Sequence, residues 1–324
     1  MNDDPASPIP FHPAWWLPGP HLPTLWAALV RRRIALDIAP ERIELPDGDF
    51  VDLAWHRVAS PRGLVLLLHG LEGGIESPYI RGQLSALGAA GFSSVVLQFR
   101  GCSGEANRLH RNYHSGETGD PRFIVELLGK REPALPLFAV GYSLGGNVLL
   151  KLLAEYGEAS PLRAAVAVSV PFDLAACATK LASGFSRVYQ SHLLRRLKTR
   201  LRGKYGKGHA VVDVDLFGQL RDFHAFDHHV TAPLHGFASG AEYYQRSSCR
   251  QYLPAIRTST LLIHARNDPF VAIDSIPATK ELPPQVRLEL TSQGGHVGFV
   301  TGLLPLHAGY WLEQRIPQFF LGAL

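Results

Sequence analysis

The chain has 324 residues, of which 46% are hydrophobic and 19% are charged, and its net charge at pH 7 is +4. This composition is typical of a globular protein with a large core and excludes an intrinsically disordered chain. No apolar run approaches the roughly 20 residues that a membrane-spanning helix needs. At this length we expect either two domains or one α/β domain with an insertion, and the modest charge does not indicate a nucleic-acid partner.

The three cysteines are widely spaced, odd in number and form no C-x-x-C pair: Cys102, Cys177 and Cys249. This usage predicts reduced thiols in the cytosol and indicates neither a disulfide framework nor a zinc site. The acidic start of the chain is not followed by an apolar core, so we expect no secretory signal. The sequence therefore predicts a cytoplasmic protein and leaves its oligomeric state open.

Residues 1–40 are expected to form an N-terminal arm. This region contains three tryptophans, and the run from His21 to Arg33 predicts a short helix that ends in three arginines. One hypothesis is an interfacial contact between the arm and a membrane. We favour the alternative, an arm packed on the domain, whose arginines stabilise the helix dipole at the C-terminal end.

Residues 41–170 and 250–324 are expected to form one α/β core. Apolar and polar residues alternate over 41–60 around a Pro-Asp-Gly turn, which predicts an antiparallel hairpin. Beyond it, continuous apolar runs predict buried strands at 63–69, 94–99, 137–140, 162–170, 260–264 and 286–290. Helices are expected at 77–90 and 117–128, directly after residue 143, and near 306–315. This alternation implies right-handed crossovers and a mostly parallel central sheet with helices on both faces.

The pattern Gly141-Tyr142-Ser143-Leu144-Gly145 lies between an apolar run and a helix-forming run. Strand, sharp turn and helix in this order predict a nucleophile elbow, whose strained backbone projects the serine hydroxyl from the tip of the strand. The two glycines leave room where side chains would come too close, and Gly146 eases the packing of helix on strand. The first amides of the helix are expected to face an acyl oxygen that gains negative charge.

Residues 171–249 interrupt the alternation and are expected to form an inserted helical cap. Leu194, Leu197 and Leu201 share one face of a predicted helix, and seven basic residues lie between Arg195 and Lys207. Such a helix most often presents a solvated face, and the alternative is weak peripheral contact with anionic lipid at the inner face of the membrane. Because no aromatic residues alternate with these cations, nucleic acid is not expected.

Three histidines could suggest other chemistry, namely His69, His224 and His228. His69 ends a predicted strand before a glycine-rich loop, and we expect it to brace that loop rather than act as a base. His224 and His228 are four residues apart, a spacing that binds metal on a helix, but no further ligands accompany them. We therefore expect neither a metal ion nor a cofactor.

Two late strands end in the partners that a nucleophilic serine needs. Asp268 follows the strand 260–264, and His296 follows the strand 286–290. Because ligand chemistry in open α/β sheets gathers beyond the carboxyl ends of the strands, we expect both residues to meet Ser143 there. Their order in the chain, Ser, Asp and then His, is that of the α/β-hydrolases. The sequence therefore predicts a catalytic triad, in which a neutral imidazole activates the serine and a carboxylate orients the imidazole.

As a group, several short motifs resemble the YheT-like branch of the α/β-hydrolases, which also includes eukaryotic membrane-associated lipases. The resemblance runs from about Phe11 to the final helix and rests on His69-Gly70-Leu71-Glu72-Gly73, Tyr113-His114-Ser115-Gly116-Glu117-Thr118, Gly141-Tyr142-Ser143-Leu144-Gly145-Gly146-Asn147, Tyr243-Tyr244, Asn267-Asp268-Pro269-Phe270 and Gly294-Gly295-His296-Val297-Gly298-Phe299. The chain departs from the branch at two positions. Asn267 replaces the first of two aspartates, which favours Asp268 as the triad acid, and Pro23 replaces a glutamine.

The resemblance implies a serine ester hydrolase with Ser143, Asp268 and His296 at the triad positions. We expect it to cleave small carboxylic esters, with short- to medium-chain acyl or lipid-like groups, through an acyl-enzyme. The backbone N–H groups of Leu71 and Leu144 are expected to form the oxyanion hole. A thioesterase, another triad hydrolase, and a binding module with little catalytic activity are the alternatives.

Overall fold

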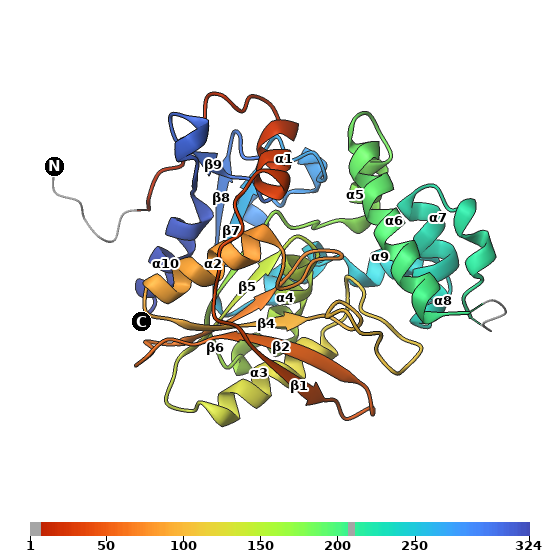
Figure 1. Cartoon of the computed structure of the whole chain (residues 1–324), viewed down its shortest axis with the longest axis horizontal. Helices are drawn as coiled ribbons and strands as arrows, with labels where there is room; N and C mark the ends of the chain where they lie inside the picture. Colours follow the sequence, from red (N-terminus) through yellow and green to blue (C-terminus); the bar gives the residue numbers. More distant parts are fainter. Residues whose placement is uncertain (1–7, 207–210) are drawn as a thin grey trace.

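In this computed structural model, which describes residues 8–206 and 211–324, an eight-stranded mixed sheet forms the centre of the protein (Figure 1). The strands are arranged in the order β1-β2-β4-β3-β5-β6-β7-β8. Only β2 is antiparallel to its neighbours, while the strands from β4 to β8 run parallel. The bounds are β1 (Ala39–Glu44), β2 (Phe50–His56), β3 (Leu64–Leu68), β4 (Ser93–Gln98), β5 (Leu137–Tyr142), β6 (Leu162–Val168), β7 (Ser259–Ala265) and β8 (Val286–Thr291).

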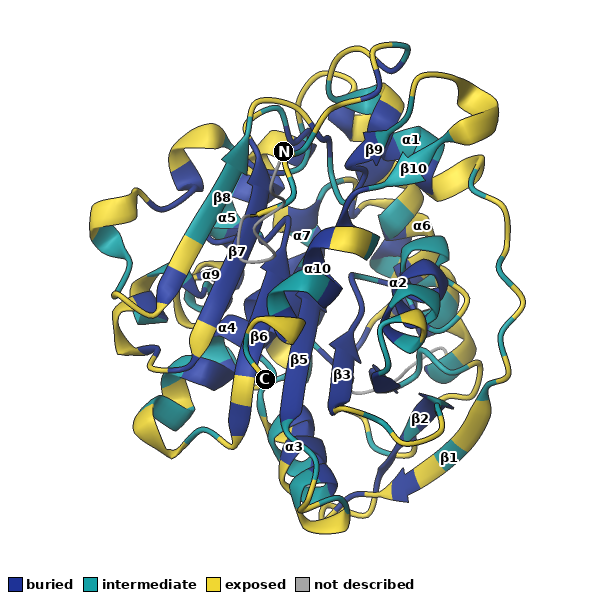
Figure 2. Cartoon of the chain, turned by 90° about the vertical axis from the view of Figure 1, so that its left-hand side faces the viewer, coloured by how far each residue is buried: buried dark blue, intermediate teal, exposed yellow. Residues whose placement is uncertain are grey.

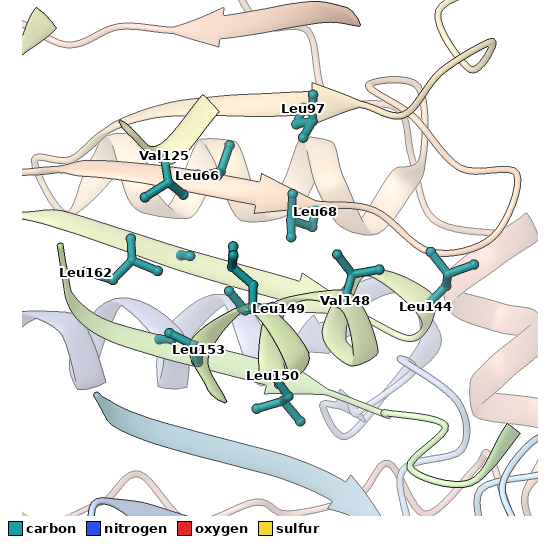
Figure 3. Packing of buried hydrophobic residues seen from close by; sticks show 14 of the residues in the cluster. Leu66, Leu68, Leu97, Val125, Leu144, Val148, Leu149, Leu150, Leu153 and Leu162 are labelled. Atoms are coloured by element: carbon teal, nitrogen blue, oxygen red, sulfur yellow. The ribbon is translucent and has the colours of Figure 1, made fainter. Parts of the chain in front are cut away.

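Helices cover both faces of the sheet, because the central strands are apolar on both sides. Along β3, Leu64, Leu66 and Leu68 pack into one core cluster, whereas Val65 and Leu67 pack into the other. The first cluster includes α3 (Gly119–Arg131) and α4 (Leu144–Tyr156), and Figure 3 shows α4 leucines against the strands. The second includes α2 (Pro78–Ala89) and α10 (Leu312–Leu321). In Figure 2 the middle strands are buried throughout, while β1 at the edge is partly exposed.

These elements confirm the predicted fold class, and the strands agree with the predicted ranges to within one or two residues at most ends. The prediction of the last helix is wrong in its position. Instead of a helix near 306–315, the chain forms β9 (Val300–Thr301) and β10 (Gly309–Tyr310), which pair as a small antiparallel sheet. The helix α10 starts only at Leu312, because Gly309 and Tyr310 use their backbone groups in the pairing with Val300 and Thr301.

The helices between β6 and β7 form a separate layer beyond the carboxyl ends of the parallel strands (Figure 1). Their apolar side chains pack into a third core cluster of their own. The helices are α5 (Leu174–Leu181), α6 (Ser186–Lys204), α7 (Phe223–Phe226), α8 (Ala232–Leu234) and α9 (Gly240–Ser247). They occupy the segment 171–249, which we continue to call the cap, and the exact division into arm, core and cap stays a prediction.

The basic helix of the cap differs from the prediction of a uniformly solvated face. Its leucines are buried as expected, at positions 194, 197 and 201. However, three of its cations are directed inward: Arg200 donates to the Glu72 carboxylate, Lys198 to the Leu220 carbonyl and Lys204 to the Asn107 side chain. These three cations hold the cap to the core and to itself, so they are not free to bind lipid. Lys207 lies outside the described residues.

The arm packs on the core, as predicted, and the first seven residues of the predicted arm lie outside the described part. The backbone N–H of Ala14 donates to the Val300 carbonyl at 3.0 Å. The helix α1 (His21–Leu29) follows, and the Arg31 guanidinium after it lies 3.9 Å from the centre of the Tyr310 ring. The arm is thereby fastened to the β9–β10 sheet. Across 8–206 and 211–324, no helix combines the length and the apolar character needed to cross a membrane.

Candidate active site

Ser143 lies in the sharp turn between β5 and α4, with backbone angles φ 51° and ψ −118°. Such a conformation is strained for any residue with a side chain. The turn is tight because a Cβ on Gly141 would lie 2.4 Å from the Gly145 carbonyl oxygen, and one on Gly145 would lie 2.4 Å from that of Leu68. A Cβ on Gly146 would lie 2.8 Å from Val170. The structure therefore confirms the predicted elbow and the reason for its glycines.

The three predicted triad residues meet beyond the carboxyl ends of the strands. His296 Nε2 lies 3.0 Å from Ser143 Oγ, and His296 Nδ1 lies 2.9 Å and 3.1 Å from the two carboxylate oxygens of Asp268. Asp268 is buried, and the His296 side chain is nearly so. These distances form a continuous hydrogen-bonded chain from hydroxyl to imidazole to carboxylate, the arrangement that activates a serine.

The imidazole is held in place by an aromatic ring. The ring of Phe270 stacks on that of His296 with a centroid distance of 4.0 Å and an angle of 3° between the ring planes. The backbone N–H of Phe270 also donates to Asp268 Oδ1 at 2.8 Å. Phe270 therefore restricts the orientation of both the His296 ring and the Asp268 carboxylate. Its position two residues after Asp268 was part of the Asn-Asp-Pro-Phe motif, but the stacking was not predicted.

The backbone of the histidine loop is anchored by residues distant in the chain. The N–H of His296 donates to Thr24 Oγ1 at 2.9 Å, and the N–H of Val297 donates to Ser169 Oγ at 3.0 Å. Asn267 Oδ1 accepts the N–H of Gly295 at 3.1 Å. Thr24 belongs to α1, so the arm takes part in positioning the imidazole. No sequence signal connected these hydroxyls to the site, since each is an ordinary residue 128 or more positions from its partner.

The two departures from the family pattern both lie at this loop. Asn267 fastens it through the hydrogen bond to Gly295, so the amide has a structural use where the branch carries an aspartate. Pro23 also contacts the loop, because Cβ atoms on Gly295 and Gly298 would lie 3.1 Å and 2.7 Å from Pro23 atoms. The N-terminal motif is therefore part of the wall around His296.

A second histidine lies beside the acid. His264 Nε2 is 3.7 Å from Asp268 Oδ2, and neither ring nitrogen has a hydrogen-bond partner among the described residues. Burial lowers the pKa of His264 to about 4, although the Asp268 carboxylate opposes this effect. A neutral His264 does not compete as a cation with His296 for the carboxylate.

The two residues predicted to supply the amides of the oxyanion hole border the same cavity as the serine. Leu71 and Leu144 line the same cavity as Ser143. Within the described part of the chain, neither amide donates a hydrogen bond, so both are free for an acyl oxygen. Leu144 is the first residue of α4, where the helix dipole favours negative charge.

The loop that carries Leu71 is locked by its neighbour Glu72. The Glu72 backbone adopts φ 54°, and its N–H donates to Tyr113 Oη at 2.8 Å. The Glu72 carboxylate accepts bonds from Tyr113 Oη at 2.9 Å and from Arg200 Nε at 3.0 Å. Because Arg200 belongs to α6, the cap itself helps to fix the loop. The motifs around Glu72 and Tyr113 were noticed in the sequence, but nothing paired either residue with a cap arginine.

His69 braces the same loop, as predicted. Its Nδ1 donates to the Gly70 carbonyl at 2.7 Å, and its Nε2 accepts the N–H of Phe99 at 3.1 Å. Burial lowers the pKa of His69 to about 4, so the ring is neutral at pH 7 and both nitrogens are used. His69 therefore lies in the support of the site rather than among its reacting groups.

Ser143 opens into a cavity of about 510 Å³ between the core, the cap and the arm. Its walls are mainly apolar side chains from α1, α5, α6 and α7, including Leu25, Leu29, Leu174, Cys177, Leu181, Val188, Leu193, Leu197, Phe223 and Phe226. The triad residues Ser143 and His296 lie in its wall as well. Such a cavity suits an apolar group held beside a reacting centre. A wider groove of about 1330 Å³ lies between cap and core, but none of the triad residues lines it.

One charged group stands in this apolar wall. Asp227 lines the cavity and is buried, with Thr231 Oγ1 and Tyr244 Oη donating to its carboxylate at 2.6 Å and 2.8 Å. Burial raises the pKa of Asp227 to about 6, against the effect of these two hydrogen bonds. His224 and His228, the spaced pair in this part of the cap, line the separate groove. Over 8–206 and 211–324 there is no cluster of three or more His, Cys, Asp or Glu side chains suited to a metal ion.

Residues 63–303 match the family described as alpha/beta hydrolase fold. The chain belongs to the α/β-hydrolase family. The Escherichia coli (strain K12) protein named "Putative esterase YheT" is 45% identical over 303 residues, which are 92% of this chain and 89% of that protein. This identity confirms the resemblance to the YheT-like branch.

Two further similarities bear on the type of this α/β hydrolase. The monoacylglycerol lipase of Saccharomyces cerevisiae is 32% identical over 245 residues, covering 73% of this chain and 54% of that protein. The solved structure of the Pyrococcus furiosus esterase Pf2001 aligns with a TM-score of 0.56 at 16% identity, over 89% of this chain and 93% of that one. The structural match shows the shared fold, and the sequence relatives place the chain among the esterase- and lipase-type α/β hydrolases.

Proposed function

We propose that the protein hydrolyses carboxylic esters through an acyl-enzyme on Ser143. The observation that carries this proposal is the hydrogen-bonded chain of Ser143, His296 and Asp268 at the wall of an apolar cavity. A binding module has no need of a serine paired with an oriented imidazole, whereas acyl transfer requires one. The names of the sequence relatives, an esterase and a monoacylglycerol lipase, agree with this chemistry.

In the first half of the proposed reaction, His296 Nε2 takes the proton from Ser143 Oγ as the oxygen attacks the ester carbonyl carbon. The Asp268 carboxylate accepts the Nδ1–H bond and stabilises the imidazolium. The carbonyl oxygen becomes negatively charged and accepts hydrogen bonds from the amides of Leu71 and Leu144. Collapse of the tetrahedral intermediate breaks the bond to the alcohol oxygen, which leaves as an alcohol with the proton from Nε2.

The second half repeats these steps with water. Nε2 takes a proton from a water molecule, whose oxygen attacks the acyl carbon bound to Ser143. The bond to Oγ breaks, Oγ regains the proton and a carboxylic acid leaves. The apolar cavity would hold the acyl group, which favours short- to medium-chain or lipid-like esters over charged substrates.

A comparison of ester and thioester substrates tests this proposal. Purified protein is assayed with p-nitrophenyl esters of increasing acyl length and with the matching acyl-CoA thioesters. We expect ester hydrolysis with an optimum in acyl length, and we expect Ser143→Ala to lower kcat by a factor on the order of 10⁴ to 10⁶. Preference for the thioesters would reassign the enzyme as a thioesterase. Hydrolysis that survives in Ser143→Ala, or none in the wild type, would reject the proposal.

A further inference from the structure

Large apolar side chains are exposed on one part of the surface. Of the thirteen exposed large hydrophobic residues that the structure describes, nine lie on only three segments. Isolated exposed apolar residues need no explanation, but a contiguous group of this kind marks an interaction surface. The nine are Trp15, Leu22, Leu29 and Val30 on the arm, Phe185 and Val188 at the start of α6, and Leu303, Leu304 and Leu306 between β9 and β10.

These three segments lie side by side. Trp15 Nε1 donates to the Leu303 carbonyl at 3.0 Å, which joins the arm to the β9–β10 loop. On the other side of α1, the rings of His21 and Phe185 are 4.6 Å apart, which joins the arm to the cap. In Figure 1, α1 lies at the upper edge with β9 on one side and the turn between α5 and α6 on the other. Figure 2 likewise shows α1 beside β9 and β10. We call this group of nine side chains the apolar rim.

Two residues of the apolar rim lie at the entrance to the cavity at Ser143. Leu29 and Val188 both line that cavity, although they are 76% and 54% exposed to solvent. A side chain that is exposed and also lines the cavity lies at its mouth. Because Leu29 belongs to α1 and Val188 to α6, the mouth opens between these two helices. The path to the serine therefore begins in the middle of an apolar surface.

The segments that carry the rim residues contain basic residues but no acidic ones, and the acidic partners nearby belong to adjoining segments, where Glu76 pairs with Arg33. Residues 5–36, 174–204 and 290–312, which carry the nine rim residues, contain no aspartate or glutamate. Exposed cations lie among the apolar side chains: Arg187 stands between Phe185 and Val188 in the chain, and Lys180 is close enough to His21 to contribute to lowering the pKa of that ring, after burial. Apolar segments that contribute basic but no acidic side chains are complementary to the interface of an anionic membrane.

We propose that the apolar rim docks on an anionic lipid surface, with α1 and the start of α6 against the bilayer. Docked in this way, the mouth faces the lipid, and an acyl ester can pass from the bilayer to Ser143 without crossing water. The use of this path rests on the proposed ester hydrolysis, but the docking itself does not. The cations that contribute are Lys180 and Arg187 rather than the inward-directed Arg200.

Vesicle binding tests the proposal without any turnover. The full chain is sedimented with vesicles of phosphatidylcholine alone, or of phosphatidylcholine with phosphatidylglycerol, at low and high salt. We expect binding to the anionic vesicles that weakens as salt screens the charges. The variant F185S/L303S/L306S, which leaves the cavity wall intact, should bind at least tenfold more weakly. The control I273S/L321S/L324S removes three exposed large apolar residues elsewhere on the surface and should bind like the wild type.

Charge reversal separates the contribution of the cations to vesicle binding from that of the apolar side chains. We expect K180E/R187E to lose most of its preference for anionic vesicles, while K130E/K280E, which changes two exposed lysines elsewhere, keeps it. Hydrolysis of soluble p-nitrophenyl acetate by all variants shows that they are folded; if the wild type proves inactive, circular dichroism serves instead. Negligible binding of the wild type at low salt overturns the proposal, as does equal binding by the rim variant. Self-association through the rim, or capture of nucleic acid without lipid binding, overturns it too.

Discussion

The elbow at Ser143 and the mouth belong to the same cavity, yet they are built differently. The elbow is fixed by backbone contacts, with glycine positions where a Cβ would lie 2.4 Å from a carbonyl oxygen. The mouth is formed by exposed side chains from two separate segments, Leu29 on α1 and Val188 on α6. We therefore expect the elbow to tolerate almost no substitution, whereas the mouth should accept many. The comparison teaches that the core supplies the groups proposed to react, while the arm and cap supply the mouth of the cavity and part of the support around those groups.

The largest effect is expected at the elbow glycine closest to β3. A methyl group at position 145 would lie 2.4 Å from the Leu68 carbonyl oxygen and 2.6 Å from that of His69, neither of which can move without displacing the strand. We expect Gly145→Ala to abolish ester hydrolysis and to destabilise the fold by about 3 kcal/mol or more.

The matched control for this substitution is Gly129→Ala on α3. A Cβ at Gly129 meets no atom within 4 Å, so the change should leave activity unchanged and stabilise the helix by up to about 1 kcal/mol. Thermal unfolding and p-nitrophenyl ester assays measure both variants. Full activity in Gly145→Ala would show that the elbow is less constrained than the contacts indicate.

A smaller effect is expected at the loop that carries Leu71, which the cap helps to fix. Tyr113→Phe removes the hydroxyl that accepts the Glu72 N–H and donates to its carboxylate. The amide of Leu71 then loses its fixed direction, and losing an oxyanion donor entirely costs about 3 kcal/mol. We therefore expect kcat to fall between about tenfold and a hundredfold with little change in KM.

Arg200 offers a second way to release the same loop, and Arg195 offers its control. Arg200→Gln should repeat the fall in kcat, while Arg195→Gln, on the exposed side of α6, should not. Arg200→Lys should restore part of the activity, because an ammonium group can still pair with Glu72. A change in KM alone would mean that the cap arginine acts on substrate binding rather than on the loop.

The arm should contribute a modest effect through the histidine loop. Thr24→Val keeps the shape of the side chain but removes the oxygen that accepts the His296 N–H. An unsatisfied amide of this kind costs about 1 to 3 kcal/mol, so kcat is expected to fall by at most about five- to 150-fold. Thr24→Ser retains the acceptor and should restore activity. Equal losses in both variants would point to packing of the arm instead of the hydrogen bond.

The smallest effect concerns stability rather than turnover. Burial raises the pKa of Asp227 to about 6, whereas the unfolded chain has the ordinary value of 3.8. Between these values the folded state binds more protons at Asp227 than the unfolded state does, so the contribution of Asp227 to the stability falls as pH rises from about 4 to about 6. Asp227→Asn removes this titration and should flatten the change. Unfolding temperatures of both proteins are measured at pH 4 and pH 7. An equal change in the wild type and in Asp227→Asn would reject this role of Asp227.

The core could be predicted from the sequence because its signals are local. Continuous apolar runs such as Leu64–Leu68 identify strands buried on both faces, and Gly141, Ser143 and Gly145 identify the turn that follows β5. Asp268 and His296 could be placed because each directly follows a strand of a parallel sheet.

The residues that complete the site could not be predicted in this way. Thr24 and Arg200 reach it through hydrogen bonds to partners 272 and 128 positions away, and neither bond leaves a periodic pattern. The exposure of Leu303 and Leu306 depends on the short β9–β10 pairing, which replaced a predicted helix. Tertiary packing, rather than local preference, decides these features.

The most direct test of the account is to locate the nucleophile. The purified protein is incubated with a fluorophosphonate, and the modified peptide is identified by mass spectrometry. The account predicts one adduct per chain, on Ser143, which is absent in Ser143→Ala and forms far more slowly in His296→Ala. An adduct on another serine, or no adduct on the folded wild type, would contradict it.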